Sequence, residues 1–206
     1  MLESPAFAKR QTVSGNLCTP TSQLEMDKFI DILKQAKLTD KDIDTLQKMI
    51  VPINAKNNKT LINYGDNCAS IYFILKGGFA MQLLRDDGTE KTINFFLDSF
   101  QPFMTVPQSY FQETKSTFKL LAIKNSDILA FSKIDLLQAI EKSATIKDFI
   151  NPKSFGFTGE LDFRTKLLTY SPKRMYELLI SDYQEVIKNV SSRHIAKHRH
   201  FTRMVE

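Results

Sequence analysis

Basic residues are concentrated at the C-terminal end of this sequence. Lys188, Arg193, Lys197, Arg199 and Arg203 oppose the single carboxylate of Glu206, so this tail accounts for +4 of the total net charge of +5. Clusters of this kind are typical of segments that contact nucleic-acid phosphates, although basic termini are also common as solvated tails. The charge distribution therefore favours an anionic partner at this end, with a solvated tail as the alternative.

The residue types needed for catalysis or metal binding are sparse. The three histidines, His194, His198 and His200, all lie in the basic tail, and Cys18 and Cys68 are the only cysteines. Two thiols cannot form a four-thiolate zinc site or an all-cysteine iron–sulfur cluster. The sequence contains no GxxxxGK[ST], HExxH, GxSxG or CxxC motif. We expect no enzymatic activity, no catalytic residues and no metal site.

The length and apolar content are those of a globular protein. The chain has 206 residues, of which 42% are hydrophobic and 25% charged, enough for one large core or two small domains. No apolar run approaches the roughly 18 residues needed to cross a bilayer, and the first ten residues lack a signal-peptide core. We expect a cytoplasmic protein with no membrane partner.

The order of local patterns predicts an α+β fold, because helical and β-type segments are segregated along the chain. Residues 1–21 read as a flexible extension. Helices are expected after Ser22, which forms a capping-box pattern with Glu25, and after Thr39. From about 53 to 132, β-branched and aromatic runs predict short antiparallel strands, with turns at Gly77 and at Asp86-Asp-Gly.

Helical spacing resumes after residue 132 and continues with interruptions. Ile134, Leu137 and Ile140 form one apolar stripe. The next helix begins either at Pro152 or only after Gly159, because glycine lowers helix stability. Further helices are expected after Ser171-Pro172 and within 190–198.

One motif connects these elements to a known family. The segment Asn63-Tyr-Gly-Asp-Asn-Cys-Ala-Ser-Ile-Tyr-Phe-Ile-Leu-Lys-Gly-Gly resembles the glycine–acid turn and aromatic strand of the Crp/Fnr family of transcription regulators, and Arg85-Asp-Asp-Gly-Thr-Glu-Lys resembles the next hairpin. The resemblance implies an antiparallel β-roll (a double-stranded β-helix, cyclic nucleotide-binding-like) with flanking helices over 22–149. It also implies a connector and dimerisation helix over 150–170 and a small helical, winged-helix-like remnant over 171–206.

The resemblance also locates a ligand segment. Family members that bind cyclic nucleotides carry a Gly-Glu pair and, about ten residues later, an Arg followed by a small hydroxyl residue. Alignment without gaps from Ala122 puts Val106 at the Glu position and Ser116 at the Arg position, while Thr117 keeps the hydroxyl. Both specific groups are missing, so we expect a degenerate pocket, no cyclic nucleotide and no other cofactor. The apolar segment 100–111 lines a pocket for a different effector or fills the cavity.

The C-terminal part resembles the lead-in and first helix of a helix-turn-helix. The recognition helix would be Thr202–Glu206, which is short for reading bases, so we expect weak or nonspecific DNA binding. The expected phosphate contacts are Arg193, Lys197, Arg199 and Arg203. The leading hypothesis is a homodimeric Crp/Fnr-like regulator with an unidentified small-molecule effector. The alternative is a β-roll ligand-binding or protein-interaction module that no longer binds DNA specifically.

Overall fold

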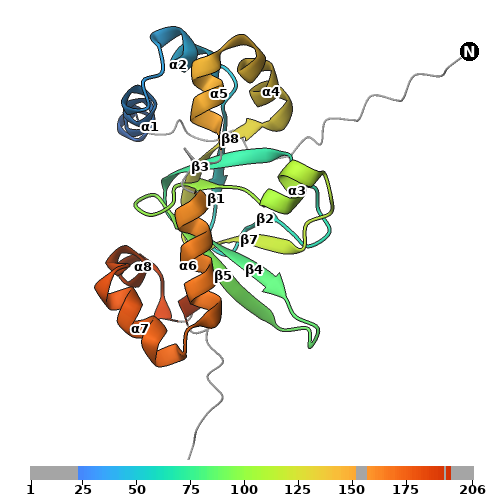
Figure 1. Ribbon diagram of the computed structural model, residues 1–206, viewed down its shortest axis with the longest axis vertical. Coiled ribbons are helices and arrows are strands. Elements are labelled where there is room, and N and C mark those ends of the chain that lie inside the picture. The colour runs from blue at the N-terminus through green and yellow to red at the C-terminus, as the bar shows by residue number, and fades with distance from the viewer. Residues whose placement is uncertain (1–22, 152–156, 193, 196–206) are drawn as a thin grey trace, which may run out of the picture.

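The computed structural model describes residues 23–151, 157–192, 194 and 195 (Figure 1). Over these residues the predicted α+β class and the antiparallel β-roll are confirmed. In chain order the elements are α1 Gln23–Gln35, α2 Asp40–Gln47, β1 Val51–Ala55, β2 Thr60–Ile62, β3 Ser70–Lys76, β4 Gly78–Leu84, β5 Glu90–Leu97, β6 Phe103–Met104, α3 Pro107–Gln112, β7 Phe118–Ala122, β8 Ser126–Ser132, α4 Lys133–Lys142, α5 Ala144–Ile150, α6 Phe157–Thr169, α7 Pro172–Ser181 and α8 Gln184–Asn189.

The described strands form two four-stranded sheets that face each other. The first has the order β1-β8-β3-β6 and the second the order β2-β7-β4-β5, and every pair is antiparallel. Alternate residues of both sheets meet in one buried core that includes Ile74, Phe79, Met81, Phe96 and Leu120. The period-2 pattern of the sequence therefore produces a filled sandwich.

Helices cover the outer face of each sheet. Ile71, Phe73 and Leu75 of β3 point away from the sandwich and pack with the helices α1, α2, α4 and α5. On the other sheet, Ala80, Phe95 and Leu97 pack with residues of α6, α7 and α8. Figure 1 shows α1, α2, α4 and α5 at one end of the molecule and α7 and α8 at the other. The helix α6 runs past the sheets between these two ends.

Two local signals hold as expected. Thr39 caps α2 in a capping box whose second partner is Asp42, and Ser171 caps α7 through Arg174 N. Gly77 connects the two sheets with φ of +96°, and an added Cβ would lie 2.3 Å from Ser126 Oγ and 2.6 Å from Asn125 O. This crossover therefore requires glycine both for its backbone angle and for space.

The structure departs from the sequence expectations in the C-terminal half. The expectation of a helix starting only after Gly159 is wrong, because α6 already includes Phe157. The helix α8 was not expected at all. The predicted stripe of α4 is largely on the surface, with Ile134 69% and Leu137 50% exposed, while Leu136 and Ala139 are buried. Among the described helices none is long and apolar enough to span a bilayer.

Candidate functional site

The predicted ligand segment forms α3, a helix of six residues between β6 and β7. Val106 is its N-cap residue, adopts an extended backbone and is completely buried. Pro107 follows at the first helical position and has no N–H to offer a ligand. The side chain at the position that the gapless alignment assigns to the family's carboxylate is thus aliphatic and buried in the core.

Ser116 and Thr117 lie after α3, and their hydroxyls are engaged locally. Ser116 is 4% exposed, and its Oγ donates to Phe118 O at 2.6 Å and accepts from Phe118 N at 3.1 Å. Thr117 is exposed, and its hydroxyl donates to Gln108 Oε1 at 3.2 Å. The structure thus places Ser116 in the core with Val106 and puts Thr117 on the surface.

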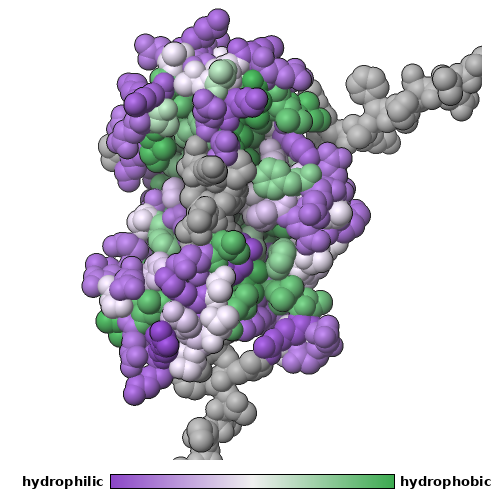
Figure 2. All heavy atoms as spheres, in the orientation of Figure 1, coloured by the Kyte–Doolittle hydropathy of each residue, from purple (hydrophilic) through white to green (hydrophobic). Residues whose placement is uncertain are grey.

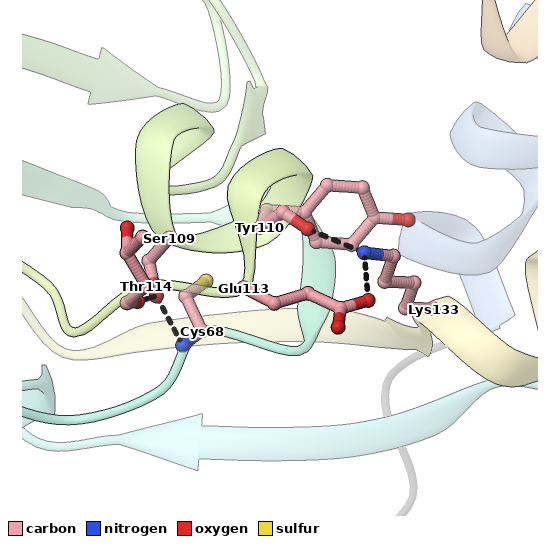
Figure 3. A network of polar contacts seen from close by, with 6 residues as sticks. All are labelled: Cys68, Ser109, Tyr110, Glu113, Thr114 and Lys133. Carbon is pink, nitrogen blue, oxygen red and sulfur yellow. Dashed lines mark hydrogen bonds and ion pairs between the residues drawn. The ribbon is translucent and has the colours of Figure 1, made fainter.

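A buried polar link fixes α3 to the turn before β3 (Figure 3). The hydroxyl of Ser109 accepts from Cys68 N at 2.9 Å and donates to Thr114 O at 2.7 Å. The Cys68 thiol lies 3.4 Å from Thr105 Oγ1, and Thr105 donates to Ser70 O at 2.9 Å. These contacts satisfy buried polar groups in α3 and in the residues just before and after it, so they hold α3 against the start of β3.

A second link joins α3 to α4. Lys133 Nζ donates to Tyr110 O and to Glu113 Oε1, both at 2.8 Å (Figure 3). Glu113 ends α3 in the left-handed region, with φ of +56°. The hydrogen bond and charge of Lys133 hold the pKa of Glu113 below its ordinary value. A cation that touches the ligand segment is therefore already paired with a carbonyl and a carboxylate.

Large apolar side chains fill the space between the sheets behind α3. Met104, Val106, Phe79, Met81 and Leu120 each have at most 1% of their surface exposed. A cavity of about 20 Å³, with room for about one water molecule, lies on the helix-covered face of the first sheet, where Phe103 of segment 100–111 lines it together with apolar residues of α1, α2, α4 and α5. Of the two readings of segment 100–111, the packing supports the filled cavity.

The predicted phosphate contacts lie outside the described residues: Arg193, Lys197, Arg199 and Arg203. The helices that precede them are packed directly on the second sheet. Phe163 of α6 is fully buried, and its ring centroid lies 5.1 Å from that of Phe100 and 4.6 Å from that of Tyr183. Lys124 Nζ also donates to Asn189 Oδ1 at 3.0 Å.

Several solved structures share this arrangement, among them three transcription regulators. A Crp/Fnr-family transcriptional regulator from Eubacterium rectale is 14% identical (TM-score 0.58, 75% of this chain and 70% of that one). The c-di-GMP-responsive regulator CLP of Xanthomonas campestris is 13% identical (TM-score 0.57, 71% and 74%). The Thermus thermophilus catabolite activator protein is 17% identical (TM-score 0.52, 67% and 63%), so this chain spans 63% of its length.

The fold is the Crp/Fnr-type β-roll. No protein-family model matches the sequence, and no curated protein matches it. With identities of only 13–17%, these structural similarities show a shared fold alone. The expectation of a cyclic nucleotide-binding-like β-roll with flanking helices is thereby confirmed at the level of structure.

Sequence reasoning missed the residues that hold α3 in place. Ser109, Glu113 and Lys133 carry its links, yet none belongs to a recognisable motif. One signal was available for Lys133, since Ser132 and Asp135 form a helix cap and the next residue must therefore lie at the first turn of α4. The partner of its ammonium group could not be found in this way, because Tyr110 and Glu113 lie at least 20 residues away in sequence.

Proposed function

We propose that this protein is an effector-sensing regulator of the Crp/Fnr type, in which a β-roll with a degenerate cyclic nucleotide site is coupled to a basic C-terminal DNA-binding region. The shared fold supports the sensor part of the proposal. The +4 charge of the tail supports the DNA-binding part. The effector is a small molecule other than a cyclic nucleotide, and no catalytic role is proposed.

The state of the ligand segment carries the proposal. A cyclic phosphate is held best by a planar guanidinium fork, and a ribose hydroxyl by a carboxylate. Here Val106 is buried in the core, and the hydroxyl of Ser116 is used by the backbone of Phe118. The ammonium of Lys133 is paired with Glu113 and so is not preorganised for a phosphate.

Calorimetry tests this part of the proposal. Titration of the full chain with cyclic AMP and with cyclic GMP at millimolar concentration should give no heat of binding. Saturable heat with either nucleotide would refute the degenerate site, whatever the result with DNA.

Fluorescence anisotropy with a mixed-sequence duplex tests the DNA-binding part. If three or four phosphates are neutralised, log K should fall with log salt with a slope near −3, at roughly −0.9 for each phosphate. A variant with Arg193, Lys197, Arg199 and Arg203 all changed to Gln should lose this binding. Absence of binding by the parent chain at low salt would remove DNA from the proposal.

The connector helix α6 supports a homodimer. Leu161 and Leu168 lie seven residues apart on α6 and are 62% and 45% exposed, a spacing suited to a helix-to-helix seam. Figure 2 shows apolar surface along α6 and toward the β4–β5 hairpin, where Leu84 is 47% exposed. Light scattering at tens of micromolar should give a dimer, and L161K/L168K should give a monomer. The control I134K changes an equally exposed residue on α4 and should leave the dimer intact.

One observation favours the second candidate function, a β-roll module that no longer binds DNA specifically. Met175, Leu179 and Val186 of α7 and α8 share one core with Phe95 and Leu97 of β5. A DNA-binding unit that must be repositioned by an effector is expected to have a smaller, more polar interface with the sensor. The anisotropy experiment bears on both functions, since absence of binding to the duplex at low salt would leave the module as the remaining candidate.

A further inference from the structure

Gln82 of β4 has a fully buried side chain, with 0% of the residue exposed. Among the residues that the structure describes, none hydrogen-bonds to its Nε2 or to its Oε1. An unsatisfied buried polar group loses its hydrogen bonds to water without replacement, and native proteins keep few of them. A primary amide with both ends unsatisfied is therefore unusual, and it points to a missing partner.

The strand register fixes where this amide lies. Gln82 pairs with Lys119 of β7 on one side and with Thr92 of β5 on the other. Ala80, two residues earlier on β4, faces α6 and its neighbours on the outer side of the second sheet. The β4–β5 register shifts between Met81 and Gln82, but the β4–β7 register stays regular, and Met81 and Leu83 both pack in the roll interior, so Gln82 between them faces outward. The amide therefore lies on the opposite side of this sheet from the roll interior and from the core around Val106.

An ion pair covers the amide. Lys119 Nζ binds Glu90 Oε1, and the two side chains are only 14% and 28% exposed. Their strands β7 and β5 flank β4, about 10 Å apart at the usual strand spacing, so the two side chains must meet above β4. Lys119 Nζ also lies 5.6 Å from the ring centroid of Tyr64. Burial and the nearby Glu90 carboxylate raise the pKa of Tyr64 to about 12, so this phenol stays neutral.

The charges of this cover decide which ligands fit. An anion would gain the ammonium of Lys119 but would also face the carboxylate of Glu90, and a cation would meet the reverse arrangement. A neutral ligand has no such conflict. The amide of Gln82 offers one donor and one acceptor side by side, and the complement is a planar group with a carbonyl next to an N–H.

We propose that Gln82 forms the floor of a binding site for a small uncharged molecule of the carboxamide class, and that the Lys119–Glu90 ion pair is the movable cover of this site. The ligand carbonyl accepts from Gln82 Nε2, and its N–H donates to Gln82 Oε1. Entry requires the ion pair to part, and both of its side chains keep some solvent exposure into which they can move. This site is independent of the regulator proposal, because it involves neither α3 nor the basic tail.

A titration of the full chain with acetamide, followed by NMR, tests the proposal. Acetate and ethylammonium serve as charged probes of similar size. Acetamide should shift the side-chain amide signal of Gln82 saturably, and the charged probes should not. Q82L should weaken acetamide binding at least tenfold, and E90Q, which breaks the ion pair but keeps the floor, should retain binding. The control Q138L alters an exposed glutamine on α4 and should bind as the parent chain does.

Three results would overturn the proposal. The first is a linear, unsaturable response to acetamide, and the second is equal binding of acetate. The third is a high-resolution structure at saturating acetamide in which an ordered water alone bridges the two amide atoms of Gln82. If Q82L fails to fold, E90Q and the three probes still decide the question on the parent chain.

Discussion

Replacement of Phe163 by Ala should separate the C-terminal helices from the β-roll. Phe163 is fully buried on α6, between Phe100 of the loop after β5 and Tyr183 before α8. Removal of a buried phenylalanine ring costs about 3–5 kcal/mol, which includes the cavity that it leaves. Domains have a total stability of about 5–15 kcal/mol, so this loss is a large fraction of it.

Urea denaturation gives the free energy of unfolding, and hydrogen exchange shows where protection is lost. F163A should lower the free energy of unfolding by about 3–5 kcal/mol and should deprotect the amides of α7 and α8 before those of β3 and β8. T165A changes an exposed residue of the same helix outside the Leu161–Leu168 seam, and it should change stability by no more than about 0.5 kcal/mol. Equal effects of the two variants, or F163A with α7 and α8 still protected, would refute the shared core.

Three further predictions concern the crossover, the ligand segment and acid stability. In urea denaturation, Gly65→Ala should lower the free energy of unfolding by about 1–2 kcal/mol, because of its positive φ alone. Gly77→Ala should lower it clearly more, because the added Cβ would also lie 2.6 Å from the backbone oxygen of Asn125, and equal losses would contradict this. Lys133→Met should destabilise the protein by about 1 kcal/mol and speed hydrogen exchange in α3. Lys142→Met, at the exposed end of α4, should change neither quantity, and unchanged exchange of α3 in Lys133→Met would disprove the link. Hydrogen bonds from Ser143 and Thr39 hold the pKa of Asp42 below its usual 3.8, so the stabilisation by its carboxylate is present above about pH 4 and is lost as the pH falls further. Asp42→Asn should remove this acid-sensitive part of the free energy of unfolding. Identical profiles of unfolding free energy against pH for the two chains would argue against it.

The packing of α6, α7 and α8 also changes how coupling between the two halves should be viewed. The strands β4 and β5 have two buried faces, with Met81 and Phe96 inside the roll and Ala80 and Phe95 against the helices. Arg164 of α6 also reaches Met81, with Nη2 3.7 Å from Sδ. The roll interior and the helices α6, α7 and α8 therefore contact opposite faces of the same two strands.

The β-roll was predictable because its signals are local. Alternation of Ile71, Phe73 and Leu75 predicts one face of a buried strand, and these residues do share a face. Gly65 and Gly77 were expected at chain reversals, and both have positive φ. Signals of this kind depend on a few neighbouring residues, so they persist in any tertiary context.

The choice of buried face was not predictable from spacing. In α4 the residues Ile134 and Leu137 have helical spacing, yet the buried pair is Leu136 and Ala139. In α6 the side chains of Leu161 and Leu168 are exposed, whereas Phe163 is buried. A helical period shows that a helix has an apolar face but does not identify what packs on it when two stripes compete.

The candidate sites divide in the same way. The sequence by itself determined that the Glu and Arg of a cyclic nucleotide site are absent at Val106 and Ser116, and that positive charge gathers after residue 187. Only the tertiary structure decided that Lys133 pairs with Glu113 across 20 residues, that Lys119 pairs with Glu90 across 29 residues, and that the amide of Gln82 is buried. The sequence specifies which side chains are present. Their burial and pairing depend on contacts between segments that are distant in sequence, and these contacts determine how favourable it is to bury each polar group.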